Sequence, residues 1–286
     1  MPTLWSMHIQ FNGKIYCGLL LLSLGSSTFA QQSSRYIRPE EPGQLAFTAG
    51  AGVANYIGDL NERAAFRRGE LGFALTIGIN YRITDHLSAR AEAGLLQIKG
   101  SQRGTRHETN NLSFRSTNPS FSGGLQVDLL PASSKPVVNP YLAVGAGFTY
   151  LSPATRYQDR WVRLPALRTE SENYSRLAAL AYGGAGLSVR LPPRLLLSVE
   201  LTYTLPSSDY VDDVSTVYSY GSSLSSTEAI LLSDRRSELG LPLHSPGEQR
   251  GFARGKDAYL TGLIRVSMPL SSAKERQYRR SVNCIK

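Results

Sequence analysis

Three histidines and one serine are the side chains best suited to acid–base or nucleophilic chemistry. Beyond residue 30 the histidines are His86, His107 and His244, and His107 lies a short distance before Ser113. A Ser/His pair can build a lipid esterase when the imidazole activates the hydroxyl. The spacing here matches no catalytic motif, and the sequence holds no Cys/His cluster, phosphate-binding glycine loop or two-histidine zinc motif. We therefore expect no catalytic residue, no cofactor site and no enzymatic activity.

A second group with possible chemistry is acidic. Asp209, Asp212 and Asp213 stand close together, and carboxylate oxygens are ligands that calcium prefers. Their spacing is not that of a calcium-binding loop. We therefore expect solvated carboxylates in a surface loop, and no metal site.

The composition limits the kind of scaffold that holds these groups. The chain has 286 residues, of which 41% are hydrophobic, and only 2 cysteines. This apolar fraction excludes a disordered protein, and the two cysteines exclude a disulfide scaffold or a cysteine-based zinc module. A mean hydropathy of −0.20, with no long apolar run after residue 30, excludes a bundle of membrane helices. A membrane protein made of strands fits, because its apolar residues alternate instead of forming runs.

The segment 70–81 has a period of two. Its odd positions are apolar from Leu71 to Tyr81, while its even positions from Glu70 to Asn80 are small or polar. Side chains alternate across a strand, so one face is apolar and the other is not. The apolar face would be the core of a soluble sandwich, or it would meet lipid in an outer-membrane barrel.

Similar alternation recurs along the chain and predicts about eight strands, an even number as in bacterial single-chain barrels. Tyrosines fall near several predicted strand ends, as expected for rings at a membrane interface or for a residue with high strand propensity; they are Tyr56, Tyr81, Tyr150, Tyr203 and Tyr259. The predicted strands are 45–58, 70–81, 87–98, 121–130, 140–151, 177–189, 195–203 and 258–270.

The lengths of the connections separate the two interpretations. Links 59–69, 99–120, 152–175 and 206–257 are long, and the links between them, 83–86, 131–139 and 191–194, are shorter. Outer-membrane barrels have tight periplasmic turns and extended outer loops, whereas a sandwich has no reason to sort its loops this way. The prediction is an all-β fold: a closed antiparallel eight-stranded transmembrane β-barrel with long extracellular loops, short periplasmic turns and periplasmic termini.

The interior of such a barrel is just wide enough for its own side chains. Three arginines and three acids fall on predicted inward positions, and buried charges need partners. We expect a salt-bridge network that plugs the lumen. Its predicted members are Arg90, Glu92, Asp128, Arg190, Glu200 and Arg265.

The first thirty residues read as a cleavable signal peptide. Lys14 precedes the apolar stretch Ile15–Leu24, and small residues lead to Ala30. We expect segment 1–30 to be removed, 31–44 to lie in the periplasm, 45–270 to form the barrel in the outer membrane, and 271–286 to form a periplasmic tail. The formal net charge of +9 does not indicate a nucleic-acid partner, because the protein is expected to be exported.

Two further segments have a distinctive composition. In the last long loop, Ser225 and Glu228 have the spacing of a capping box before an apolar run, with Gly240 and Pro242 beyond it, so a short helix is expected. The tail is basic and is expected to be solvated, attracted to anionic lipid heads, or docked on an acidic partner. Its proposed docking residues are Lys274, Arg276, Arg279, Arg280 and Cys284.

Several blocks in the same order resemble an outer-membrane β-barrel family of Bacteroidota that includes PorG of the type IX secretion system. The resemblance covers nearly the whole chain after the signal peptide. The first block contains Tyr56, Gly58, Asp59, Leu60 and Asn61, and the strongest contains Asp209, Tyr210, Asp212, Asp213 and Ser215. Further blocks are 111–115, 140–147, 232–235, 250–251 and 256–259; the last has Ala258 where the family usually has an aromatic residue.

The resemblance implies a non-enzymatic role in protein export across the outer membrane, beside a periplasmic ring of PorK and PorN and other type IX components. It supplies no catalytic residues. Two alternatives remain: a general small outer-membrane barrel for adhesion or envelope stability, and a lipid-modifying barrel enzyme built on Ser113 and His107. Outer-membrane lipid is an expected partner in every case.

Overall fold

The computed structural model describes residues 42–60, 71–191, 195–219, 224, 226–251 and 257–270. The predicted signal peptide, the segment 31–41, Asn61, Ser225 and the tail 271–286 lie outside them. The strands are β1 (Leu45–Ile57), β2 (Gly72–Arg82), β3 (Leu87–Ser101), β4 (Ser113–Asp128), β5 (Val138–Tyr150), β6 (Pro153–Tyr157), β7 (Arg160–Arg163), β8 (Leu177–Leu191), β9 (Leu195–Pro206) and β10 (Ala258–Pro269).

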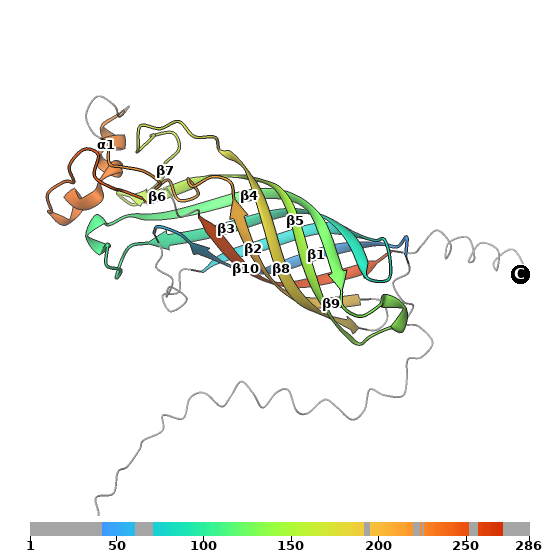
Figure 1. The fold of residues 1–286 in the computed structure, drawn as a ribbon. Coiled ribbons are helices and arrows are strands. Elements are labelled where there is room, and N and C mark those ends of the chain that lie inside the picture. The colour runs from blue at the N-terminus through green and yellow to red at the C-terminus, as the bar shows by residue number, and fades with distance from the viewer. Residues whose placement is uncertain are drawn as a thin grey trace, which may run out of the picture. The chain divides into compact units, whose positions relative to one another are not determined.

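Eight of these strands close into an antiparallel barrel (Figure 1). Each barrel strand pairs with the next along the chain, and β1 pairs with β10 from Ala46↔Pro269 to Ile57↔Ala258. Closure leaves no strand edge of the ring unpaired, which a lipid environment requires because it offers the backbone no hydrogen bonds. The predicted fold class is confirmed.

The alternation of side chains places apolar residues on the outside of the barrel. On β2, Ile77 is 58% exposed, and on β5 Val144 is 59% exposed. Their sequence neighbours Thr76, Gly78, Ala143 and Gly145 lie on the other face, since successive residues of a strand point to opposite sides. This large exposed apolar surface is the face that meets lipid.

The buried apolar core lies inside the barrel near its outer end. Ile98 of β3, Tyr56 of β1 and Leu151 are fully buried there. The rings of Tyr56 and Phe114 meet edge to face, with 4.9 Å between their centroids. Tyr56 and Tyr259 therefore point inward, so they are not the membrane-interface rings that one interpretation of the sequence expected. Tyr81, Tyr150 and Tyr203 are exposed on the outside.

The predicted bounds of β3 and β4 were too short at the ends that the chain connects. β3 continues to Ser101 instead of ending at residue 98, and β4 begins at Ser113 instead of residue 121. The added residues of β4 pair with β3 from Gly94↔Ser120 to Ser101↔Ser113. Residues 113–120 are mostly polar and include Pro119, so their composition is typical of a loop. A strand that continues beyond the hydrocarbon, however, has no need of apolar residues on its outer face.

The link 152–175 also contains structure that the sequence pattern did not reveal. β6 and β7 form a hairpin that joins the sheet through β4, at Arg115↔Ala154 and Ser116↔Pro153. Gln158 and Asp159 of its turn have φ values of 45° and 63°, the left-handed backbone that a two-residue hairpin turn requires. The usual turn signal of Asn or Asp followed by Gly is missing, which is why the hairpin was not predicted.

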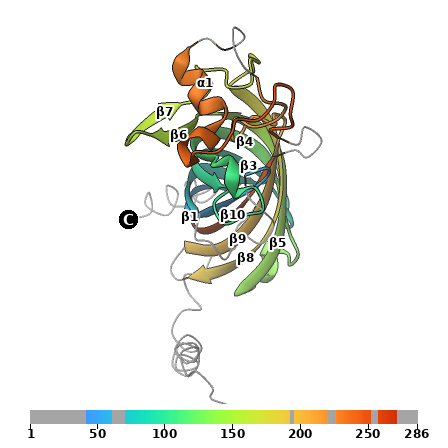
Figure 2. The same ribbon diagram turned by 90° about the vertical axis from the view of Figure 1, so that its left-hand side faces the viewer.

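The last long loop contains the expected short helix, α1 (Thr227–Ser233), followed by a 3₁₀ turn, η5 (Arg235–Leu239), which ends at Gly240 with φ +68°. The predicted capping box was wrong by one residue. Ser226 is the N-cap, and its Oγ accepts a hydrogen bond from the Ala229 N–H at 3.1 Å. Glu228 instead forms an ion pair with Arg160 of β7 at 2.7 Å. Figure 2 shows α1, β6 and β7 at the same end of the barrel.

Two shorter 3₁₀ turns, η2 (Glu108–Asn110) and η3 (Ala132–Ser134), lie between β3 and β4 and between β4 and β5. Within the described residues, no helix is long and apolar enough to cross a membrane.

Candidate functional site

Four of the six predicted lumen residues form one ion-paired network. Arg90 of β3 binds Glu200 of β9 at 2.9 Å and Glu92 at 3.0 Å. Arg265 of β10 pairs with the same two acids, at 3.2 Å from Glu200 and closely with Glu92. All four residues are at most 9% exposed. The network therefore connects opposite walls of the barrel through its interior.

Glu200 is the centre of this network. Both of its carboxylate oxygens accept bonds from arginines, and Oε2 also accepts the Tyr141 hydroxyl at 2.8 Å. Thr202 donates to Oε1 at 3.2 Å. Both oxygens of this buried carboxylate therefore have hydrogen-bond donors in place of water.

The other two predicted lumen residues belong to a separate group near the periplasmic turns. Asp128 pairs closely with Arg82 and accepts a bond from Gln126 at 2.8 Å. Arg190 lines a cavity of about 40 Å³ together with Asp128 and Arg82. Arg82 was missed because the predicted strand ended at Tyr81, although Arg82 continues the even, inward positions.

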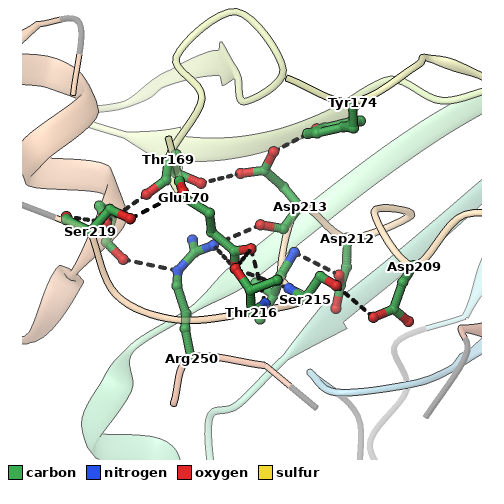
Figure 3. A network of polar contacts seen from close by, with 12 residues as sticks. Thr169, Glu170, Tyr174, Asp209, Asp212, Asp213, Ser215, Thr216, Ser219 and Arg250 are labelled. Atoms are coloured by element: carbon green, nitrogen blue, oxygen red, sulfur yellow. Dashed lines mark hydrogen bonds and ion pairs between the residues drawn. The ribbon is translucent and has the colours of Figure 1, made fainter. Parts of the chain in front are cut away.

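A second polar cluster lies outside the barrel ring, among the loops. We call it the outer cap and define it as the residues labelled in Figure 3, with Tyr56 and Asp257. The labelled residues are Thr169, Glu170, Tyr174, Asp209, Asp212, Asp213, Ser215, Thr216, Ser219 and Arg250.

The pair Arg250–Glu170 holds two loops of the outer cap together. Arg250 Nη1 lies 2.9 Å from Glu170 Oε1, and both side chains are 2% exposed. The same guanidinium group donates to the backbone oxygens of Asp213 at 2.7 Å and Ser233 at 3.1 Å. Glu170 also accepts the N–H groups of Ser215 at 2.9 Å and of the next residue at 3.0 Å. One ion pair thus joins the β5–β8 loop, which holds Glu170, to the backbone of the β9–β10 loop (Figure 3).

Asp213 and Asp212 are buried, so the prediction of solvated carboxylates was wrong for both. Asp213 accepts hydrogen bonds from Thr169 Oγ1 at 2.6 Å and from the Tyr174 hydroxyl at 2.5 Å. Burial raises the pKa of Asp213 to about 6, against the opposing effect of the positive charge of Arg250. Asp209 is only partly buried, and burial raises its pKa while a hydrogen bond from Ser215 at 2.7 Å opposes the shift.

Asp212 and Asp257 share one phenol. The Tyr56 hydroxyl oxygen lies 2.6 Å from Asp212 Oδ2 and 2.5 Å from Asp257 Oδ1. A phenol has one proton, so it donates to only one of the two carboxyl groups, and the other short contact needs a proton on the acid. Burial raises the pKa of both acids, and the nearby charge of Asp212 raises that of Asp257 further. The pair therefore binds a proton more tightly than isolated carboxylates do.

The remaining motif residues support this arrangement. Leu60 belongs to the buried apolar core, and Tyr210 stacks on Tyr174 with 4.2 Å between centroids. A Cβ atom at Gly58 would overlap the Tyr56 hydroxyl and the Asp257 carboxylate, and one at Gly251 would lie 2.8 Å from Asp59. Glycine is needed at both positions because the neighbours leave no room for a side chain.

The histidines and Ser113 have separate contacts. His107 Nε2 accepts a bond from Arg106 at 3.0 Å, while Ser113 Oγ accepts one from Arg235 at 3.3 Å. His244 stacks on Tyr218 and lies 2.9 Å from Asp234. His86 is exposed in its turn, with Nδ1 2.8 Å from the Asp128 carbonyl oxygen. Within the described ranges, no group of three or more His, Cys, Asp or Glu residues has a geometry that could hold a metal ion.

Glu170 is the central acid of the outer cap, and no sequence pattern indicated it. It stands in a loop with no motif around it, and its partners come from residues 213–250. Only the fold brings them together.

Solved outer-membrane barrels resemble this fold at low sequence identity. Neisserial surface protein A is 12% identical, with 78% of this chain and 96% of that chain covered and a TM-score of 0.41. Ail, the attachment invasion locus protein of Yersinia pestis, is 10% identical, with coverage of 80% and 99% and a TM-score of 0.39. OprG from Pseudomonas aeruginosa is 12% identical, with coverage of 82% and 100% and a TM-score of 0.40.

No curated protein matches the sequence significantly. Residues 17–221, well over half of the chain, match the family described as outer membrane protein beta-barrel domain. The match agrees with the closed eight-stranded ring, its apolar exterior and its polar, ion-paired interior. The chain therefore belongs to the outer membrane protein β-barrel domain family, and it is a barrel of the Gram-negative outer membrane.

Proposed function

We propose that this protein is a non-enzymatic outer-membrane component of the type IX protein secretion machinery that anchors or docks the periplasmic PorK/PorN ring. The sequence support is the ordered set of blocks that resembles the Bacteroidota barrel family containing PorG. Separate blocks in one order are less easily explained by chance than a single short match.

The observation that carries the proposal is that these blocks meet in and around the outer cap. Tyr56 of the first block contacts Asp212 of the strongest block, and Arg250 of a later block donates to the Asp213 carbonyl oxygen. Arg235 reaches Ser113 of the block 111–115. The resemblance therefore concerns one folded unit, which supports a shared architecture with that family.

The contacts inside the barrel favour a scaffold over an enzyme. The charged lumen residues Arg90, Glu92, Glu200 and Arg265 bind one another. Ser113 and His107 are bonded to two different arginines, an arrangement unlike a nucleophile activated by its base. A plugged, rigid barrel is suited to hold partners at the membrane.

Docking on the ring is assigned to the periplasmic end, where the short turns and the basic tail 271–286 would be located. The tail has five basic residues, Lys274, Arg276, Arg279, Arg280 and Lys286, against Glu275 alone. Such a segment is attracted to an acidic face of a partner protein, and this attraction weakens with salt. Cys284 is a suitable position for a crosslinker.

The test is deletion of the gene in its own host, with the secreted proteins measured and the native membrane complex isolated. We expect loss of type IX cargo from the medium, restored by the full chain, and capture of PorK and PorN by a crosslinker at Cys284. Normal secretion after deletion would overturn the proposal and leave the general role in adhesion or envelope stability. Restoration by a chain carrying His107→Ala and Ser113→Ala is expected, and its failure with a folded barrel would support the enzyme instead.

A further inference from the structure

The outward face of β4 changes from apolar to basic towards its outer end. Phe121 is 61% exposed within the apolar band. The next outward positions are Pro119, Thr117 and Arg115, because every second residue of a strand lies on the same face. The side chains thus pass from aromatic through polar to cationic along one line.

The neighbouring strand β3 has the same gradient. Leu95 lies opposite Pro119, Gln97 opposite Thr117 and Lys99 opposite Arg115. Gln97 donates a hydrogen bond to Thr117 at 3.3 Å, so the two polar residues form one row across the strands. Lys99 and Arg115 form the next row outward.

The β6–β7 hairpin extends this basic row. Arg115 lies opposite Ala154 of β6, which lies opposite Arg163 of β7, so Arg115 and Arg163 share a face. Arg156 and Trp161 lie opposite each other two positions along the hairpin, and therefore on that same face. The register places three arginines and a tryptophan side by side.

A direct contact supports this placement. The Arg115 guanidinium carbon lies 3.6 Å from the centroid of the Trp161 ring, a cation–π contact. Trp161 is 48% exposed and Arg163 is exposed. We call Lys99, Arg115, Arg156, Trp161 and Arg163 the basic face. Arg156 also pairs with Asp159 at 2.9 Å, but both side chains are largely exposed, so water and other anions compete with this contact.

The height of the basic face corresponds to the lipid headgroups. Six residues of strand from Phe121 to Arg115 span about 20 Å along the strand, or about 15 Å along the barrel axis at a tilt of about 40°. Phe121 belongs to the apolar band, which is about 25 Å tall in such barrels. Phe121 is the outermost large apolar residue on this face of β4, so Arg115 and its neighbours lie beyond the hydrocarbon, on the side of the headgroups, and face away from the barrel.

We propose that the basic face binds the phosphorylated glycolipid of the outer leaflet, through the phosphate groups of lipid A. The guanidinium fork matches phosphate with two parallel hydrogen bonds, and the three arginines can surround one headgroup. Trp161 suits the interface because its ring is apolar and its N–H is polar. The site fixes one glycolipid against the β3, β4, β6 and β7 side of the barrel.

Trp161 makes the site directly observable. The chain has 2 tryptophans, Trp161 and Trp5, which lies in the predicted signal peptide. Trp5→Phe in the full chain removes the emission of any uncleaved chain, so the fluorescence comes from the proposed site alone. This protein is reconstituted in phosphatidylcholine vesicles with increasing fractions of lipid A, of dephosphorylated lipid A, or of phosphatidylglycerol. Heat-dependent migration on gels verifies that each variant is folded.

We expect the Trp161 emission to saturate with lipid A at a lower fraction than with phosphatidylglycerol, and to be unaffected by the dephosphorylated lipid. Arg163→Gln should raise the fraction of lipid A at half-saturation about fivefold, since one cation near a charged lipid surface contributes roughly that factor. Arg160→Gln is the matched control, because Arg160 is on the same strand with the same charge but on the opposite face, bound to Glu228. It should leave the titration unchanged.

Three outcomes would overturn the proposal. Equal shifts for Arg163→Gln and Arg160→Gln would mean a diffuse charge effect without a site. Equal responses to phosphatidylglycerol and lipid A would mean attraction to any anionic surface. No response of Trp161 to lipid A would exclude the glycolipid. None of these results depends on the proposed role in secretion, so the two proposals are tested separately.

Discussion

The Tyr56 hydroxyl lies 2.6 Å from a carboxylate oxygen of Asp212, although 156 residues separate the two in the sequence. Tyr56 is the penultimate residue of β1, and Asp212 lies in the last long loop, so this bond ties the loop to the rim of the barrel. Both side chains are fully buried. The outer cap is thereby part of the folded barrel and not a collection of independent loops.

Acidification should tighten the outer cap. The pKa of Asp213 is raised from 3.8 to about 6 by burial, so the folded state holds its proton more tightly than the unfolded state. The resulting stability is fully present below the ordinary pKa and is lost as the pH rises through about 6. Burial also raises the pKa values of Asp212 and Asp257.

Hydrogen exchange of the Ser215 and Thr216 amides, corrected for intrinsic rates, should be slower at pH ~5 than at pH ~7.5. Asp213→Asn should reduce this dependence, and faster exchange at the lower pH would contradict it.

Removing the charge of Glu200 should destabilise the barrel. Glu200→Gln leaves Arg90 and Arg265 buried with one shared acid, Glu92, and an uncompensated buried charge costs about 3–5 kcal/mol. Urea unfolding in lipid vesicles measures the loss. The control is Glu228→Gln, because Glu228 makes an exposed ion pair worth less than about 1 kcal/mol. Equal stability of the Glu200→Gln variant and the unaltered protein would show that the network contributes nothing.

A charge on the lipid-facing surface should also be costly. Ile77 lies at the middle of β2 and is 58% exposed. Ile77→Arg should reduce the free energy of unfolding in bilayers by about 2–4 kcal/mol, while Ile77→Leu should have little effect. Urea unfolding in lipid vesicles measures the free energy of unfolding of both variants. Tolerance of arginine at this position would mean that the face does not meet hydrocarbon.

A methyl group at Gly58 should loosen the outer cap without opening the barrel. It would overlap the Tyr56 hydroxyl and the Asp257 carboxylate, and such overpacking typically costs about 1–3 kcal/mol. Limited proteolysis should cleave the segment 207–251 faster in Gly58→Ala, with the heat-dependent gel migration retained. Gly183→Ala is the matched control, since a Cβ there meets nothing within 4 Å. Unchanged proteolysis of Gly58→Ala would contradict the packing described here.

The barrel itself was predictable because lipid and lumen impose a strict period of two. The alternation in residues 70–81 gave the correct faces. The same period in the other predicted strands indicated inward charges at Arg90, Glu92, Glu200 and Arg265, which the structure brings together. The pattern failed where the strands rise beyond the hydrocarbon. There the outer face of β4 is polar, so its residues 113–120 resemble a loop.

The outer cap could not be derived from local sequence. Tyr56 looks like an interface residue because it ends a strand, and Asp213 looks solvated because it stands among loop residues. Burial of either depends on partners far along the chain, such as Asp257 and Tyr174. The resemblance marked several of these positions as related, but only the contacts explain why they occur together.

The paired charges that fill the centre of the barrel have a consequence for permeability. Arg90 and Glu200 occupy the cross-section that a solute would need, and an eight-stranded ring has little room beyond its own side chains. A nutrient or antibiotic of the kind that porins admit would have to displace this ion-paired network before it could pass through the barrel.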